Sequence, residues 1–180
     1  MIADYEFENG DKIFANATNA ARNIATLKTR ARSAGIPVIY VNDNYGLWKN
    51  DFDATLECAA RSERGKQIVE LLGPNKDDYH VLKPQRSGFF ATPLDVLLTS
   101  LDISDLIITG ITADICVLFT AHDAYMRGYR ISVPADCTAA ADSETCNAAL
   151  DMLRRTADAD INPSTAIELK RHAEKTSAAR

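Results

Sequence analysis

Cys116 is the residue of this chain whose type and position best suit covalent chemistry. A short apolar run from Asp105 leads through Gly110 into a helical pattern, and Cys116 lies six residues after that glycine. This spacing predicts a thiol at the carboxyl end of a strand and at the start of a helix. There the backbone N–H groups and the helix dipole favour an anion. A buried structural cysteine at a strand–helix junction fits the same segment equally well.

Two charged residues are expected at the same edge of the fold. Lys83 directly follows one β-branched run, 80–82, and Asp43 follows another, 37–41. Ligands of wound α/β sheets bind at the carboxyl ends of the strands, so these two side chains should converge with Cys116. An ammonium beside the thiol would favour a thiolate and orient a carbonyl substrate. On its own Lys83 would be interpreted as a solvated loop residue, but the convergence favours chemistry at Cys116.

Short β-branched runs alternate with longer helical patterns along the chain. The runs predict strands at 37–41, 80–82, 106–109 and 129–133, and the patterns predict helices at 12–34, 58–72, 92–101, 115–127 and 143–155, with a weaker helix at 164–172. This alternation predicts a three-layer, Rossmann-like, doubly wound α/β sheet that is mainly parallel, because right-handed crossovers cover both of its faces. Residues 1–10 contain no convincing strand, so the sheet is expected to lack its first strand.

The composition is that of an ordinary soluble globular protein. The 180 residues are 46% hydrophobic and 25% charged, which suits a single domain over residues 1–180. A net charge of −5 without a stripe of Lys and Arg residues argues against binding to nucleic acid. No apolar run approaches the roughly 20 residues that span a bilayer. No secretory signal is visible, and the four cysteines form no C-x-x-C pair, so a reducing cytoplasm is expected.

Two motifs carry a resemblance to a known family. Residues 83–90 read Lys-Pro-Gln-Arg-Ser-Gly-Phe-Phe, and residues 109–117 read Thr-Gly-Ile-Thr-Ala-Asp-Ile-Cys-Val. Together they resemble the isochorismatase-like cysteine hydrolase superfamily, and the segments 40–44, 121–124 and 133–137 extend the likeness over nearly the whole chain. The resemblance implies a six-stranded parallel α/β fold, a small-molecule substrate, and a homo-oligomer that is a dimer or a tetramer.

The resemblance also implies a catalytic triad of Asp, Lys and Cys. Cys116 would be the nucleophile, and Lys83 would keep the surroundings of the thiolate and the substrate oxygen electropositive. An Asp would move the thiol proton to the leaving amine. The peptide bond between Ile111 and Thr112 would be cis. By the same analogy, the N–H groups of Thr112 and Cys116 would form an oxyanion hole.

The sequence departs from the family at the position of the triad Asp. In the family pattern this Asp directly precedes the residue that aligns with Met1, so it is absent here. Asp4 matches a second, non-triad Asp and is not assigned the role of base. The expectation is that Met1 is an internal methionine of a longer natural protein. The alternative is a short form with an impaired triad.

No metal site and no cofactor are predicted. Nicotinamidase-type members bind a metal through an Asp that is followed closely by His residues, but after Asp43 the next histidine is His80. His122 and His172 are widely separated from it, and no H-x-H or H-x-x-x-H spacing occurs.

The loop after the first predicted strand supplies candidates for lining a pocket: Asp43, Asn44, Tyr45 and Trp48. The alternative for this loop is a lid that packs against a neighbouring subunit. The chain as a whole is interpreted as a metal-independent cysteine hydrolase of a small amide or related C–N bond. The alternatives are an isochorismatase-type vinyl ether hydrolase and a catalytically silent domain that binds a small carbonyl ligand.

Overall fold

The strands form parallel pairs. The computed structural model describes residues 1–49 and 51–169, and all strand pairings within them are parallel. The pairs are β1 (Ile39–Asp43) with β2 (Tyr79–Lys83), β3 (Asp105–Ile107) with β5 (Arg130–Ser132), and β4 (Gly110–Ile111) with β6 (Thr138–Ala139). The register pairs Asp43 with Lys83, so both lie at the same carboxyl edge. The predicted parallel α/β fold is confirmed.

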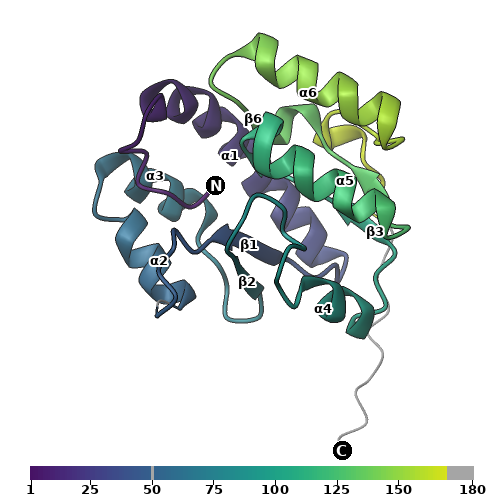
Figure 1. Ribbon diagram of the computed structural model, residues 1–180, viewed down its shortest axis with the longest axis horizontal. Helices are drawn as coiled ribbons and strands as arrows, with labels where there is room; N and C mark the ends of the chain where they lie inside the picture. Colours follow the sequence, from purple (N-terminus) through teal and green to yellow (C-terminus); the bar gives the residue numbers. More distant parts are fainter. Residues whose placement is uncertain (50, 170–180) are drawn as a thin grey trace, which may run out of the picture.

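Helices cover both faces of these strands, as Figure 1 shows. The helices are α1 (Gly10–Ser33), α2 (Phe52–Ala59), α3 (Glu63–Leu72), α4 (Leu94–Ser100), α5 (Leu118–Met126) and α6 (Ser143–Thr156), and the short turns are η1 (Ala113–Val117), η2 (Ala135–Cys137) and η3 (Ser164–Ala166). α1, α2 and α3 supply one layer, and α4, α5 and α6 supply the other. No helix among the described residues is both long enough and apolar enough to cross a bilayer.

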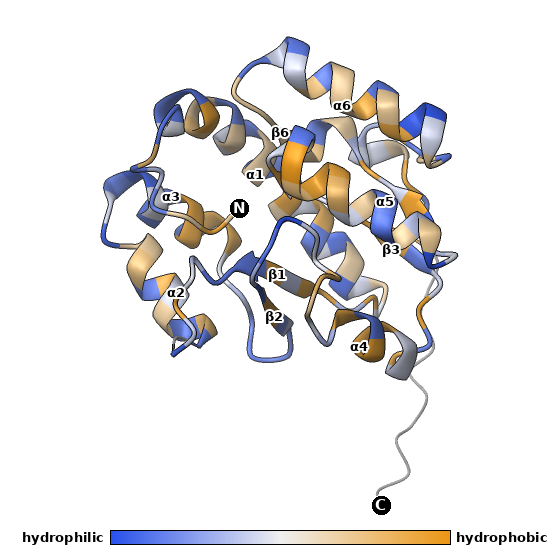
Figure 2. Ribbon diagram, in the orientation of Figure 1, coloured by the Kyte–Doolittle hydropathy of each residue, from blue (hydrophilic) through white to orange (hydrophobic). Residues whose placement is uncertain are grey.

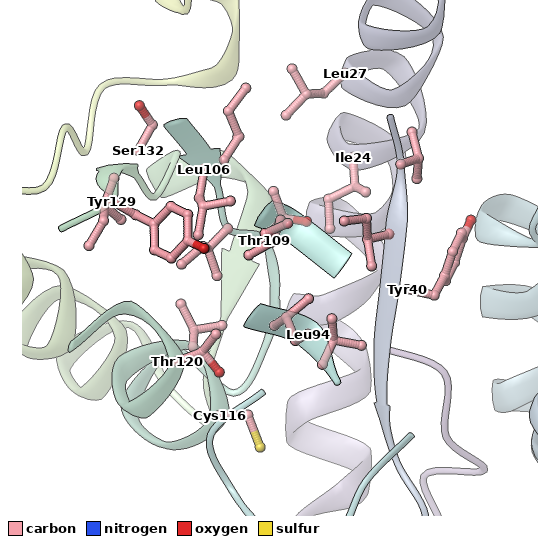
Figure 3. Close-up of a pocket in the computed structure, with 18 of the residues that line it drawn as sticks. Ile24, Leu27, Tyr40, Leu94, Leu106, Thr109, Cys116, Thr120, Tyr129 and Ser132 are labelled. Atoms are coloured by element: carbon pink, nitrogen blue, oxygen red, sulfur yellow. The ribbon is translucent and has the colours of Figure 1, made fainter. Parts of the chain in front are cut away.

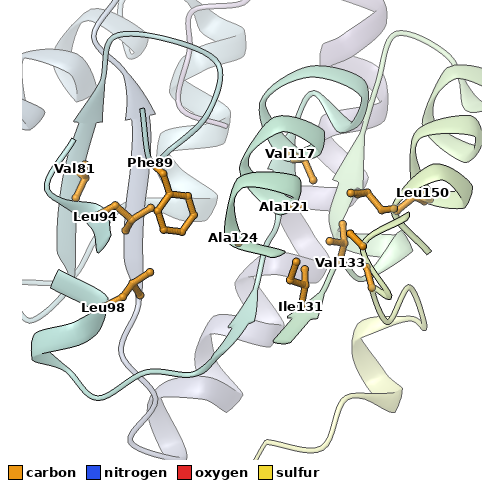
Figure 4. Packing of buried hydrophobic residues seen from close by; sticks show 13 residues of the cluster. Val81, Phe89, Leu94, Leu98, Val117, Ala121, Ala124, Ile131, Val133 and Leu150 are labelled. Carbon is orange, nitrogen blue, oxygen red and sulfur yellow. The ribbon is translucent and has the colours of Figure 1, made fainter. Parts of the chain in front are cut away.

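The core on the side of α4, α5 and α6 joins side chains from distant parts of the chain. Leu94 and Leu98 of α4 pack with Val81 of β2, while Val117 and Leu153 pack near the other strands. Figure 4 shows the first group beside β1 and β2 and Val117 at the start of α5. The core on this face therefore connects β2, which ends at Lys83, with the helix that follows Cys116.

The core on the opposite side is built on α1. Its buried residues recur at three- and four-residue intervals, which gives the long helix one apolar face. They are Gly10, Ile13, Ala17, Ala20, Ala21, Ile24, Leu27 and Ala31. Figure 2 shows that β1 changes from hydrophobic to hydrophilic towards its carboxyl end, where Asn42 and Asp43 lie. The polar end of this strand marks the edge at which the candidate site forms.

Three predicted helices differ from the structure. The helix predicted at 58–72 is two helices, because Ser62 begins α3 by accepting a hydrogen bond from the N–H of Gly65 at 2.9 Å. The helix predicted at 115–127 starts earlier, with the π-helical turn η1. The helix predicted at 164–172 is only the short turn η3, and residues 170–172 lie outside the described residues. The expectation of no strand in residues 1–10 is confirmed.

Candidate active site

Lys83 brings the predicted reactive groups together. Its Nζ lies 3.4 Å from Cys116 Sγ, 3.2 Å from Asp43 Oδ2 and 2.8 Å from the carbonyl oxygen of Gln85. Asp43 and Lys83 end the paired strands β1 and β2, and Cys116 lies in η1, directly before α5. The convergence expected from the strand ends is therefore present in the structure.

The environment of Lys83 suits a charged side chain that acts inside the protein. Only 4% of Lys83 is exposed, and a buried ammonium needs hydrogen-bond acceptors and an opposite charge. Asp43 supplies the charge and Gln85 supplies a carbonyl acceptor, which leaves the ammonium in contact with the sulfur of Cys116. Cys116 itself is partly exposed, so a small molecule can reach the thiol.

The segment before Cys116 changes direction sharply. The Ile111–Thr112 peptide bond is cis, at the position that the family resemblance indicates. The carbonyl oxygen of Thr112 accepts hydrogen bonds from the N–H groups of Ile115 at 3.2 Å and Val117 at 3.1 Å, which anchors the start of η1. The oxyanion hole formed by the N–H groups of Thr112 and Cys116 stays a prediction.

A cavity lies beside Cys116, and the loop after β1 contributes fewer residues to its lining than expected. Asp43 and Tyr45 line it, and the hydroxyl of Tyr45 donates a hydrogen bond to the carbonyl oxygen of Ile2 at 2.9 Å. Although 52% of Tyr45 is exposed, burial around its hydroxyl raises the pKa of Tyr45 to about 12. That hydroxyl is therefore a neutral donor at ordinary pH.

Asn44 and Trp48 do not line the cavity, which corrects the expectation for them. Asn44 is buried, and its side-chain oxygen accepts a hydrogen bond from the N–H of Gly46 at 2.9 Å, so the amide is used within its own loop. The chain then turns at Gly46, which has a φ of 73°, and leaves Trp48 78% exposed. These two side chains are structural and surface features of the loop.

The two histidines that the structure describes bond or stack with groups other than the thiol. His122 contacts the carbonyl oxygen of Leu118 and the hydroxyl of Thr156, and His80 is exposed in β2 and stacks on Phe52. His172 lies outside the described residues. Within residues 1–49 and 51–169, no group of three or more His, Cys, Asp or Glu side chains could hold a metal ion.

A large cavity opens beside this cluster. Its volume is about 1390 Å³, and Asp43, Lys83, Thr112 and Cys116 line one end of it. Figure 3 shows Cys116 at that end, with Ile24 and Leu27 of α1 on one side and Leu106 and Tyr129 on the other. The thiol therefore faces a space with mainly apolar walls.

The family of the chain follows from sequence comparison. The isochorismatase domain matches residues 2–161. The chain belongs to the isochorismatase family. It is 42% identical over 162 residues to the uncharacterized isochorismatase family protein YaaI of Bacillus subtilis (strain 168), with 89% of this chain and 88% of that protein covered. The resemblance stated from the two motifs is confirmed.

Solved structures agree with this family at the level of the fold. N-carbamoylsarcosine amidase from Thermoplasma acidophilum has a TM-score of 0.67 at 30% identity, with 86% of this chain and 87% of that chain covered. The nicotinamidase SaPncA from Staphylococcus aureus has a TM-score of 0.63 at 27% identity, with 80% and 82% covered. The isochorismatase family thus includes amidase-type hydrolases, and at the level of the family this chain is assigned to the hydrolases.

In this family member, four further residues join the loop after Lys83 to the helix after Cys116. Ser87 donates a hydrogen bond to Asp123 at 2.7 Å, and the N–H of Gly88 donates to the hydroxyl of Thr120 at 2.9 Å. Thr120 and Asp123 lie four and seven residues after Cys116. This helical spacing places them on the same side of the helix and could have identified them from the sequence. Their hydrogen bonds hold the loop after Lys83 against the helix after Cys116.

Proposed function

We propose that this isochorismatase family protein is a metal-independent cysteine hydrolase that cleaves a C–N bond of a small amide or ureido compound. The observation that carries the proposal is the 3.4 Å distance from Lys83 Nζ to Cys116 Sγ at the mouth of the cavity. A thiol becomes a strong nucleophile as a thiolate, and an adjacent ammonium stabilises that anion. Cys116 is the proposed nucleophile, and Lys83 is its electrostatic partner.

The proposed reaction has two stages. First, Cys116 Sγ forms a bond to the carbonyl carbon, and the N–H groups of Thr112 and Cys116 hold the oxygen that becomes negative. The C–N bond then breaks, and the leaving nitrogen takes up the proton that the thiol lost. Second, water attacks the thioester, the C–S bond breaks, and the acid leaves while the thiol regains a proton.

The names of the structural neighbours support the substrate class. One is an N-carbamoylsarcosine amidase and the other is a nicotinamidase, so both act on C–N bonds next to a carbonyl group. An isochorismatase-type vinyl ether hydrolase is the alternative enzyme. It would need a proton donor rather than the Cys116 nucleophile.

A second candidate function is binding of a small carbonyl ligand without turnover. Asp43 is the carboxylate that contacts Lys83, and within the described residues the sulfur of Cys116 forms its hydrogen bond with Lys83 alone. A thiol without a carboxylate beside it lacks an evident base for the second stage. This feature is the one that supports the binding function as the second candidate.

The test is release of ammonia from a panel of primary amides and ureido acids. We expect the wild-type chain to hydrolyse at least one compound and Cys116→Ala to lose at least about 1000-fold in kcat, since covalent catalysis depends on the sulfur. Cys58→Ala removes another partly exposed thiol and should retain activity. Full activity of Cys116→Ala on a vinyl ether would contradict the thiol mechanism. Binding of panel compounds without turnover would support the silent domain.

A further inference from the structure

Arg86 lies on a loop segment that is anchored on both sides beside the candidate active site. It stands between Gln85, whose carbonyl oxygen accepts a hydrogen bond from Lys83 Nζ at 2.8 Å, and Ser87, whose hydroxyl donates to a carboxylate of α5 at 2.7 Å. The first anchor is the same ammonium that contacts Cys116 Sγ at 3.4 Å. The backbone of Arg86 is therefore held close to the thiol.

The side chain of Arg86 extends over α5, close to the start of that helix. Its Cζ lies 5.8 Å from the centroid of the Phe119 ring, which is a cation–π contact, and Phe119 is 47% exposed. Phe119 follows Cys116 by three residues. Side chains at this spacing are neighbours on the surface of a helix, with their Cβ atoms about 5–6 Å apart. The guanidinium of Arg86 is therefore displayed about one helical turn from the thiol.

The charge of Arg86 is not neutralised by a carboxylate of the protein. Arg86 is exposed, and none of the ion pairs among residues 1–49 and 51–169 includes it. By contrast, Arg127 at the end of α5 pairs with Asp95 and with Asp123, each at 3.3 Å. A guanidinium over an aromatic ring can still present its N–H fork to a carboxylate, which it binds through two parallel hydrogen bonds. The site therefore combines a reactive thiol with an unpaired cation at a fixed place.

We propose that Arg86 is a carboxylate-binding subsite of the candidate active site, so that the substrate is an amide or ureido compound that also carries a carboxylate. The inference rests on the proposed function and names its substrate class. The carbonyl carbon would lie at Cys116 Sγ and the carboxylate at the N–H fork of Arg86, joined by a short linker. Lys83 does not compete for this carboxylate, because it is only 4% exposed and already pairs with Asp43.

Alkylation of Cys116 tests the subsite without turnover. The reagents are N-iodoacetyl-β-alanine, which carries a carboxylate, and its N-methylamide, which has a similar length and no charge. The readout is the ratio of the two rates at Cys116, measured by peptide mass spectrometry, because a change in the ionisation of the thiol alters both rates alike. We expect the wild-type chain to prefer the anionic reagent. In Arg86→Gln the ratio should fall at least about tenfold, since charge-assisted hydrogen bonds are lost.

Two further variants separate this subsite from the general electrostatic field of the protein. Arg61→Gln removes the charge of another exposed arginine, in the turn between α2 and α3, and should keep the wild-type ratio. Arg86→Lys keeps the charge and removes the planar fork, so we expect it to retain only part of the preference. An unchanged ratio in Arg86→Gln, an equal fall in Arg61→Gln, or the full wild-type ratio in Arg86→Lys would each overturn the proposal.

Turnover separates failure of the subsite from failure of the proposed function. Each ureido acid of the substrate panel is compared with its N-methylamide, and ammonia release gives kcat/KM for both. We expect the wild-type chain to favour the acid and Arg86→Gln to lose this preference mainly through KM. Hydrolysis with a preference that Arg86→Gln does not change would overturn the subsite and leave the proposed function intact. No turnover of any compound, together with an alkylation ratio that depends on Arg86, would overturn the proposed function and support the subsite.

Discussion

At the scale of single residues, Lys83 determines what Cys116 can do. The ammonium is almost fully buried and contacts one carboxylate, one carbonyl oxygen and the sulfur. A buried cation in this setting is held by its partners, so each partner depends on the others. The lysine therefore links the end of β2 to the thiol by electrostatics rather than by packing.

Lys83→Met tests this link, because methionine keeps the apolar stem and removes the charge. We expect alkylation of Cys116 by iodoacetamide at pH 7.5 to slow by roughly tenfold, because the positive charge 3.4 Å from the sulfur is removed. The rate is measured by peptide mass spectrometry, with Cys58 in the same sample as an internal reference. Lys76→Met changes an exposed lysine and should leave the rate as it is. An unchanged rate in Lys83→Met would show that the ammonium does not act on the sulfur.

The meeting of Lys83 and Cys116 could be predicted from the sequence, whereas the role of Trp48 could not. Both reactive residues adjoin strand ends, and parallel strands bring such ends to one edge. Trp48 follows a turn at Gly46, and the direction of a loop after a glycine depends on contacts that no local pattern encodes. The cis bond at Ile111 was expected only through the family resemblance.

At the scale of elements, the loop after β2 and the helix α5 act as one unit. Gly88 is buried, and its N–H donates to the hydroxyl of Thr120. Ser87 donates to Asp123, whose carboxylate also pairs with Arg127 at 3.3 Å. These contacts position the loop that follows Lys83 against the helix that follows Cys116.

Thr120→Val should weaken this unit, because valine keeps the shape of threonine and removes the acceptor. A buried N–H left without a partner costs about 1–3 kcal/mol, and we expect a loss of that size in the free energy of unfolding measured with urea. Thr29→Val is the control, since Thr29 is exposed on α1 and bonds only within its helix. Equal effects of the two substitutions would mean that the bond to Gly88 does not stabilise the loop.

The first residues of the chain are held by the N-terminus of α3. The hydroxyl of Ser62 accepts a hydrogen bond from the N–H of Gly65 and donates one to the carbonyl of Asp4 at 2.5 Å. Gly65 also has no room for a side chain, because a Cβ there would lie 2.6 Å from the carbonyl oxygen of Ala3. Segment 1–6 and α3 are therefore joined by polar and steric contacts.

Ser62→Ala removes both hydrogen bonds and should lower the free energy of unfolding by about 2 kcal/mol. Asp51→Ala is the matched control, because Asp51 caps α2 at the N–H of Ala54, and within the described residues its side chain bonds to no other segment. We expect about 1 kcal/mol for this cap alone. Hydrogen exchange in residues 2–5 should accelerate in Ser62→Ala only. Acceleration in both variants would show that the bond to Asp4 is not what holds the segment.

The boundary between α2 and α3 also shows where sequence patterns fail for elements. Residues 58–72 were predicted as one helix because apolar residues recur at helical spacing on both sides of Ser62. The break arises because Ser62 can bond both to its own helix and to Asp4, which is distant in sequence. A local pattern contains no information about that second partner.

At the scale of the whole molecule, the core forms in two layers around a sheet that has a gap between β1 and β3, which do not pair within the described residues. The parallel sheet with helices on both faces was predictable, because strands alternating with helices have few other solutions. That the two parts of the sheet keep their separation was not predictable. α1 packs against α3 and also against β4 and β6, and its Lys28 lies over the ring of Tyr40 in β1, so one helix contacts strands on both sides of the gap.

Buried titratable groups in these layers make the stability of the fold sensitive to alkaline pH. Burial raises the pKa of Tyr40 to about 12 and, together with the neighbouring Asp136, raises the pKa of Cys137 to about 12. A group whose pKa is raised by folding stabilises the folded state below its unfolded pKa, which is 9.0 for the thiol and 10.0 for the phenol. This stability is lost as the pH rises towards 12. Lys28 acts in the opposite direction, because burial lowers its pKa to about 8.

Cys137→Ala should therefore change the pH dependence of stability as well as its level. We expect the free energy of unfolding of the wild-type chain to fall between pH 9 and pH 11, because the unfolded thiol loses its proton there while the folded thiol keeps it. The variant lacks this thiol, so its urea midpoint should fall less steeply over the same range. Val133→Ala removes a fully buried apolar side chain and should lower the midpoint at every pH with the wild-type slope. Equal slopes in wild type and Cys137→Ala would show that the buried thiol does not link protons to folding, and the alkaline loss would then belong to the tyrosines.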